Sequence, residues 1–115
     1  RIGDYSKISD SNVDNFSILG EHVTVERSAI MDAVKIGDYC HISDSIIGRK
    51  VIIESNRDKP TCIESTSVIG NSVRIGRGCM FKRTRVNPGL TIPGGMWYVD
   101  KCLQTYEDVV HLADQ

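Results

Sequence analysis

Long hydrophobic runs are missing from this 115-residue sequence, whose apolar stretches extend over only a few residues. A helix that crosses a bilayer needs about 20 consecutive apolar residues, so a membrane is not an expected partner. The chain also opens without the basic and then apolar segments of a secretory leader. Together these absences predict a cytoplasmic protein.

An excess of charge of either sign is also absent. Lysine and arginine number 14, and aspartate and glutamate number 15, which gives a formal net charge of -1. Binding to nucleic acid or to an anionic lipid surface depends on positive charge. Nucleic acid is therefore not an expected partner, because such binding would need a local basic patch.

Cysteine is scarce and widely spaced, at Cys40, Cys62, Cys79 and Cys102. No two of these residues form the C-x-x-C pair of a redox or zinc motif, and four are too few to staple a secreted scaffold of this length. We therefore expect reduced thiols. The sequence leaves the roles of Cys62 and Cys102 open.

What the sequence does contain is an internal repeat. Aliphatic residues follow one another at steps of six, five and six, so that equivalent positions recur every 17 residues. These positions are Ile2, Leu19, Ile36 and Ile53.

The rhythm weakens through the polar stretch from 54 to 62, which contains Pro60, and then returns. Across this stretch we align Ile53 with Ile69, 16 residues later, and Ile69 with Val86 after a further 17. The polar stretch is then a distorted side of one turn. The expected total is about five turns.

This spacing excludes the common alternatives. A helix with 3.6 residues per turn would spread these positions around its cylinder. An antiparallel hairpin array would show two-residue Asn-Gly or Asp-Gly turns, which do not occur at the needed intervals. Three short strands per turn, separated by corners and stacked in parallel about 4.8 Å apart, fit the pattern. The sequence therefore predicts an all-β fold.

Each repeat unit also has a fixed internal order. An aliphatic residue is followed by glycine, two polar residues and a small residue, as in the segment from Ile36 to Cys40. A narrow interior explains the small residue, so Cys40 and Cys79 are expected in the core. The unit resembles the hexapeptide repeat over residues 1–95, which implies a left-handed parallel β-helix. The left hand is an exception to the usual crossover rule and comes from the resemblance alone.

Residues 96–115 are expected to close the fold with one last strand and a short capping helix from about 105 to 114. Thr105 and Asp108 have the spacing of a capping box. We expect this helix to lay an apolar stripe over the last turn, with Trp97 as filler beneath it. The stripe consists of Tyr106, Val109, Val110 and Ala113.

Within the repeat, the run from Val25 to Gly48 resembles the C-terminal β-helix of sugar-nucleotide pyrophosphorylases, such as glucose-1-phosphate adenylyltransferase and mannose-1-phosphate guanylyltransferase. The resemblance implies a role in subunit assembly and, as in some members, in effector regulation. In that family a separate N-terminal domain carries a GGxGTRLxPLT loop and holds Mg²⁺.

That loop does not occur in this sequence. We therefore expect a catalytic nucleotidyltransferase domain N-terminal to this chain, no cofactor in the chain itself, and no activity of the chain alone. The nucleotide and the sugar remain open.

The same fold implies a second hypothesis, an acetyl-CoA-dependent hexapeptide acyltransferase. Such enzymes use a histidine as general base in a cleft between subunits, and His22, at a corner, is the candidate here. His41 and His111 are expected at the surface. No metal site is expected, because a zinc site of the γ-carbonic-anhydrase kind needs three converging histidines.

Positive charge is concentrated between residues 57 and 86, where seven bases stand against two acids. A solvated face, a contact with the catalytic domain, or a site for an anionic effector would each explain it. The candidate effector residues are Arg74, Arg77, Lys82, Arg83 and Arg85.

Several aliphatic residues are expected to point outward from the flat faces. Exposed apolar residues on a flat surface are typical of contacts between subunits. A homo-oligomer is therefore expected, whether dimer, trimer or tetramer. The residues concerned are Ile18, Ile46, Ile52 and Val68.

Overall fold

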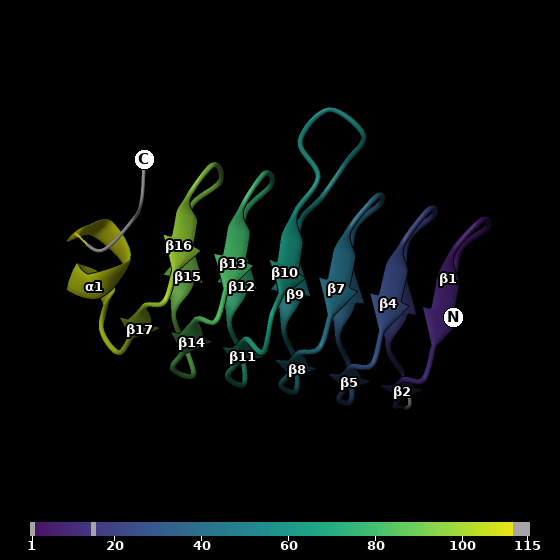
Figure 1. Ribbon diagram of the computed structural model, residues 1–115, viewed down its shortest axis with the longest axis horizontal. Coiled ribbons are helices and arrows are strands. Elements are labelled where there is room, and N and C mark those ends of the chain that lie inside the picture. The colour runs from purple at the N-terminus through teal and green to yellow at the C-terminus, as the bar shows by residue number, and fades with distance from the viewer. Residues whose placement is uncertain (1, 15, 112–115) are drawn as a thin grey trace.

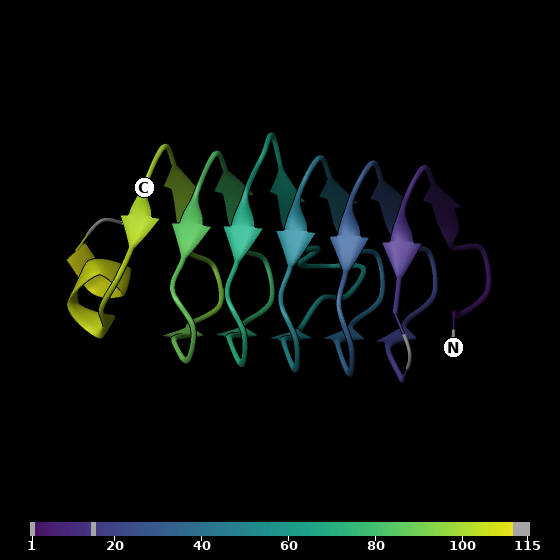
Figure 2. The same cartoon turned by 90° about the horizontal axis from the view of Figure 1, so that it is seen from below.

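The structure is a computed structural model and describes residues 2–14 and 16–111. In this part of the chain, short strands form three parallel sheets that run along one axis, with one helix after the last strand (Figure 1). The first and last strands lie at opposite ends of this axis, and the strands stack in regular rows between them (Figure 2).

We name each sheet after its first strand. The β1 sheet consists of β1 (Lys7–Ser9), β4 (Thr24–Glu26), β7 (His41–Ser43), β10 (Cys62–Glu64), β13 (Met80–Lys82) and β16 (Trp97–Val99). The β2 sheet consists of β2 (Asn12–Val13), β5 (Ala29–Ile30), β8 (Ile46–Ile47), β11 (Val68–Ile69), β14 (Arg85–Val86) and β17 (Cys102–Leu103). The β3 sheet consists of β3 (Ile18–Leu19), β6 (Lys35–Ile36), β9 (Ile52–Ile53), β12 (Arg74–Ile75) and β15 (Thr91–Ile92).

The three sheets form a left-handed parallel β-helix, which confirms the predicted fold class. Every strand pairs in parallel with the strand one turn away. The register places Leu19 beside Ile36 and Ile36 beside Ile53, and Ile2 forms a single bridge to Leu19. The predicted 17-residue column therefore exists.

The number of turns and the alignment of the later repeats differ from the prediction. The β-helix has about six turns rather than five. Ile53 pairs with Ile75, and Ile69 pairs with Ile47, so the expected match of Ile53 with Ile69 is wrong. The reason is the polar stretch after β9, which leaves the wall of the prism as a loop (Figure 1) and so breaks the 17-residue period.

Close approach between turns explains the glycine that follows the inward aliphatic residue. A Cβ atom built on Gly37 would lie 2.6 Å from the carbonyl oxygen of Ser55 in the next turn. Most corners, in contrast, use non-glycine residues in the left-handed region, with φ of 57° at His22 and 62° at Tyr39. Three later corners use glycine there, at Gly78, Gly89 and Gly95. The side chain of His22 at such a corner is exposed, whereas other corner residues such as Ser45 and Val51 are buried.

The interior holds the aliphatic columns together with small neighbours, as the repeat pattern predicts. Cys40 and Cys79 are both buried directly before strands of the β1 sheet, as is Val23. Val51 and Val73 fill the corresponding small sites before strands of the β3 sheet. Burying one aliphatic side chain contributes about 1.5–3 kcal/mol. The core is therefore a continuous rod whose stability comes from neighbouring turns.

Helix α1 (Tyr106–His111) begins with the expected capping box. The backbone N–H of Thr105 donates to Asp108 Oδ2 at 3.2 Å, and the N–H of Asp108 donates to Thr105 Oγ1 at 3.4 Å. The predicted range 105–114 extends past residue 111, and residues 112–115, including Ala113, lie outside the described residues. No helix among the described residues is long and apolar enough to span a membrane.

The packing beneath α1 differs from the prediction. Trp97 is 51% exposed, whereas Tyr98 is fully buried and its hydroxyl donates to the carbonyl oxygen of Val109. Successive strand residues point to opposite faces, so Tyr98, not Trp97, fills the space. Tyr106 and Val110 are exposed, and Val109 alone among the described stripe residues is buried.

Candidate functional site

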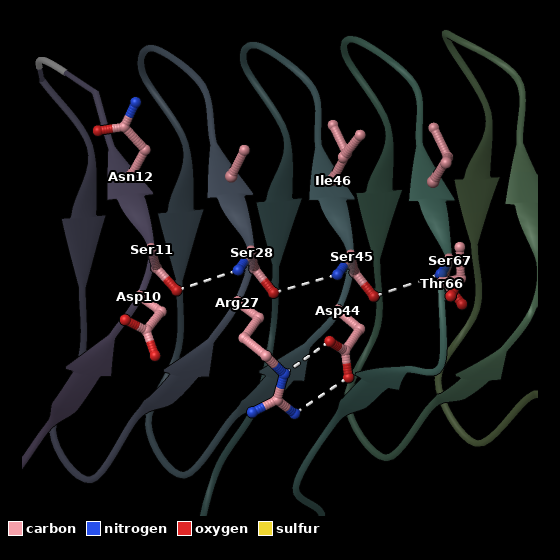
Figure 3. Close-up of a pocket in the computed structure, with 12 residues that line it drawn as sticks. Asp10, Ser11, Asn12, Arg27, Ser28, Asp44, Ser45, Ile46, Thr66 and Ser67 are labelled. Carbon is pink, nitrogen blue, oxygen red and sulfur yellow. Dashed lines mark hydrogen bonds and ion pairs between the residues drawn. The ribbon is translucent and has the colours of Figure 1, made fainter.

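A shallow groove follows the outer surface of the β2 sheet and the corner that precedes it (Figure 3). Its floor is mostly apolar, because Ala29, Ile46 and Val68 occupy equivalent outward positions on β5, β8 and β11. Asn12 occupies the same position on β2. Its rim is polar. The rim residues are Asp10, Ser11, Arg27, Ser28, Asp44, Ser45, Thr66 and Ser67.

A ladder of serine hydroxyls links the turns along this groove. Ser28 Oγ donates to the Glu26 carbonyl at 2.8 Å and accepts the backbone N–H of Ser45 at 3.1 Å. Ser45 Oγ donates to the Ser43 carbonyl at 2.7 Å and accepts the N–H of Ser67 at 3.3 Å. Because each hydroxyl proton is already donated to the backbone, these serines hold the corner together and are not poised as nucleophiles.

Two of the three charged residues on the rim, Arg27 and Asp44, neutralise each other. Arg27 forms a two-point contact with Asp44, at 2.7 Å from Nε and 3.1 Å from Nη2. Its hydrogen bond and charge raise the pKa of Arg27 and lower the pKa of Asp44. Since both partners stay ionised and paired, the groove offers no free cation for a phosphate.

The candidate base His22 lies at an exposed corner between β3 and β4. Its ring stacks between the rings of Tyr5 and Tyr39, at centroid distances of 5.0 and 4.6 Å. These three residues stand 17 positions apart, so the repeat period itself is the signal that could have revealed the stack. No hydrogen bond orients the imidazole among the residues that the structure describes, so within one chain the ring is held by stacking.

Three of the five basic candidates form ion pairs with a neighbouring turn. Arg83 contacts Asp100 at 2.6 and 3.2 Å, which raises the pKa of Arg83 and lowers that of Asp100. The other two pairs lie at the surface with nitrogen–oxygen distances of 3.6 Å. They are Arg74 with Glu54 and Lys82 with Glu64.

The five basic residues do not lie on one face. Arg74 belongs to the β3 sheet and Arg77 to the corner after it, Lys82 belongs to the β1 sheet with Arg83 at its corner, and Arg85 belongs to the β2 sheet. The sequence grouped them by position along the chain, but one turn of the prism distributes them around its axis. The structure therefore does not gather them into a single anion site.

Residues 1–98 match the family model of the GMPPB C-terminal domain. The chain belongs to the GMPPB C-terminal domain family. This assignment agrees with the resemblance of residues 25–48 to the C-terminal β-helix of pyrophosphorylases.

Solved structures show the same fold as this chain. One is the acetyltransferase domain of PglB from Neisseria gonorrhoeae, with 21% identity and a TM-score of 0.78 over 88% of this chain. The chain spans about half (49%) of the length of that domain. Another is a candidate acetyltransferase from Bacillus cereus, with 19% identity and a TM-score of 0.51, where 96% of this chain covers 83% of the other. A comparison with curated proteins found no significant match.

The four thiols of this chain are all free. Burial raises the pKa values of Cys40 and Cys79, and burial together with the nearby Glu64 raises the pKa of Cys62. A raised pKa leaves less thiolate, so these three cysteines are poor nucleophiles. Cys102 is exposed on β17, and its Sγ accepts a hydrogen bond from Gln104 Nε2 at 3.7 Å.

Metal ligands do not converge in the part of the domain that the structure describes. No group of three or more His, Cys, Asp or Glu side chains there could hold an ion. His22 lies at a corner, whereas His41 lies on β7 between Thr24 and Cys62. The two histidines are therefore not brought together.

A second groove lies on the β3 sheet. Ile18, Lys35 and Ile52 line it from the strands, and Glu54 and Arg77 line it from the corner side. Ile18 and Ile52 are 45% and 37% exposed, as expected for outward aliphatic residues. This surface offers apolar contact flanked by charge, which suits protein association better than chemistry.

Proposed function

We propose that this chain is the C-terminal β-helix domain of a sugar-phosphate nucleotidyltransferase and that it serves subunit assembly. The observation that carries the proposal is the match to the GMPPB C-terminal domain over residues 1–98. The described surface supports it, because Ser28 and Ser45 link neighbouring turns and three of the five candidate cations form ion pairs between turns.

The reaction belongs to a separate domain of the parent protein. There a sugar 1-phosphate oxygen attacks the α-phosphorus of a nucleoside triphosphate, the new P–O bond forms, and pyrophosphate leaves with the broken bond. Mg²⁺ would neutralise the phosphates in that domain. We assign no step of that reaction to the residues of this chain.

The test compares the isolated chain with the full-length parent protein. Pyrophosphate release is measured with each of the common nucleoside triphosphates and a panel of sugar 1-phosphates. We expect release by the parent and none by the isolated chain. Absence of release by the parent with every pair, or turnover by the isolated chain, would overturn the proposal.

An acetyl-CoA-dependent acyltransferase is the second candidate, because the similar solved structures are described as acetyltransferases. This hypothesis needs acetyl-CoA to bind between subunits and His22 to act as base. Calorimetric titration of the chain with acetyl-CoA tests the first requirement. A His22→Asn variant, which cannot act as a base, tests the second in an acetyl-transfer assay with amine and hydroxyl acceptors.

An anionic effector also stays a prediction. The matched variants are Arg85→Ala, which removes an exposed cation, and Arg83→Ala, which removes a cation already paired with Asp100. If an anion regulates the parent enzyme through these residues, its response to phosphorylated metabolites falls in these variants while basal turnover is kept.

A further inference from the structure

The charges that flank the β3 sheet are segregated along the axis of the prism. On the corner that follows this sheet, the early turns carry only acids, Asp4, Glu21 and Asp38. The later turns carry the bases Arg57, Lys59 and Arg77 with two acids, Asp58 and Glu54, and Glu54 is paired with Arg74. One edge of the face is thus acidic at one end and basic at the other.

The opposite edge of the same face repeats this order. The corner that precedes the β3 sheet carries Asp14 and Asp32 in the early turns, and Arg49 and Lys50 immediately before β9. Along both edges, therefore, the acidic residues lie near the first turns and the basic residues lie near the later turns. The uneven charge noted in the sequence is, in space, a dipole along this face.

Several of these charges have no partner within the chain. Among the residues that the structure describes, Glu21, Asp32, Arg49, Lys50 and Arg77 make no ion pair within 4.0 Å. Arg27, Arg74, Lys82 and Arg83, in contrast, each form an ion pair within the chain. The face thus presents charge that is available to a second molecule.

Between the two edges lies the apolar part of the face. Ile18 and Ile52 are 45% and 37% exposed, with the aliphatic stem of Lys35 on the strand between them. The molecule extends 36 × 26 × 20 Å, so one face of the prism is of the order of the 800 Å² that each partner contributes to a stable interface. The surface is therefore large enough to hold two chains together.

From this pattern we infer that the β3 face joins two copies of this chain in an antiparallel dimer. Its twofold axis lies within the interface, along the strand direction, between β6 and β9. A parallel pair, or a ring of parallel chains, would set acid against acid and base against base along this face, which is unfavourable. Antiparallel chains match both edges at once. This inference rests on the proposed role in subunit assembly and specifies the partner and the face.

The geometry pairs particular turns. With the axis between β6 and β9, the turn of β3 faces that of β12 in the partner, so Glu21 lies opposite the partner's Arg77. The turn of β6 faces that of β9, so Asp32 lies opposite the partner's Arg49. Lys35 covers the partner's Ile52 and brings its ammonium group toward the partner's Glu54.

The test uses the 115-residue chain and charge reversal, with mass and dissociation constant measured by sedimentation at low salt. The wild type is expected at twice the 12.8 kDa chain mass. Glu21→Arg and Arg77→Glu should each weaken the dimer about tenfold or more, because each places like charges together twice per dimer. In the double variant the two charges change places, so opposite charges face each other again. Its dissociation constant should return to within about threefold of the wild-type value.

Two further variants keep the test sharp. Asp32→Lys on the other edge should weaken the dimer independently, whereas Arg85→Glu on the β2 sheet should leave it unchanged. Unchanged circular dichroism identifies variants that remain folded. A monomeric or trimeric wild type, single reversals without effect, or a double variant that fails to recover would each overturn the inference.

Failure here is distinguishable from failure of the proposed function. The parent protein could release pyrophosphate and yet have a different subunit arrangement. That result would overturn the inferred dimer face and leave the nucleotidyltransferase proposal standing. A parallel trimer that binds acetyl-CoA would overturn both.

Discussion

Single side chains in this molecule act mainly across turns. Ser45 illustrates this, because its hydroxyl connects a carbonyl of its own turn with an N–H of the next, and its side chain is nearly buried. The equivalent residue near the C-terminal end is Thr84, whose hydroxyl donates to the Lys82 carbonyl at 2.9 Å and whose backbone N–H donates to Ser67 Oγ at 3.2 Å. The ladder therefore needs a hydroxyl and tolerates a methyl group.

Replacing Ser45 should test this directly. Ser45→Ala leaves the buried N–H of Ser67 without a partner, which costs about 1–3 kcal/mol. Ser45→Thr keeps the hydroxyl and should cost less. The free energy of unfolding is measured by urea denaturation. Equal losses in the two variants would show that packing, not the hydroxyl, matters at this corner.

The Tyr98 hydroxyl provides a pH test at the same scale. Burial raises the pKa of Tyr98 to about 12, whereas an unfolded tyrosine titrates near 10. Between these values the unfolded chain releases a proton that the folded chain retains, so stability falls as pH rises above about 10.

The control for this test is Tyr98→Phe, which removes the titrating group. We expect thermal unfolding between pH 8 and 11 to show a smaller decrease in melting temperature for Tyr98→Phe than for the wild type. The two should differ little in slope below pH 9. Parallel slopes throughout the range would contradict a raised pKa at Tyr98.

Among the elements, the regular strands could be predicted from the sequence and the loop could not. Periodic aliphatic residues report a strand that is buried on one side, and the 17-residue spacing placed Leu19, Ile36 and Ile53 in one column. The stretch after β9 has no inward aliphatic residue, so the repeat pattern does not indicate its path. Its own hydrogen bonds close it, including one at 2.7 Å from the N–H of Lys59 to Asn56 Oδ1.

The surface was harder to predict than the core for a related reason. A period identifies which residues share a column, so the buried positions of Cys40 and Cys79 followed from it. It does not tell which face of the prism a charged residue occupies unless every turn has the same length. Because the turn after β9 is longer than the others, a fixed period does not place the later basic residues on the correct faces. The pairing of Arg74 with Glu54 was missed for this reason.

Helix α1 supplies a prediction at this scale. Thr105 accepts the N–H of Asp108 at the helix start, so Thr105→Ala should weaken the capping box by about 1 kcal/mol. Thr105→Ser keeps the acceptor and serves as the control. Hydrogen exchange of the α1 amides should be faster in the alanine variant only. Equal exchange in both variants would mean that the Tyr98 contact alone holds the helix.

At the scale of the whole molecule, the position of a repeat in the stack decides what each residue contributes. Ile2 and Ile53 occupy the same place in the repeat, yet Ile2 is 50% exposed and Ile53 is 1% exposed. Ile53 has β-strand neighbours on both sides, Ile36 and Ile75, whereas Ile2 contacts the stack through one bridge to Leu19. Residues at the same place in the repeat therefore contribute unequally to the free energy of unfolding.

Alanine substitutions at these two positions make the last prediction. Ile53→Ala creates a cavity between two packed turns and should reduce the free energy of unfolding by about 2–5 kcal/mol. Ile2→Ala removes a half-exposed side chain at the end of the stack and should cost well under half as much. Chemical denaturation of both variants gives the comparison. Since neighbouring turns stabilise each other in a linear array, equal losses would mean that the first turn is packed against something beyond its own stack.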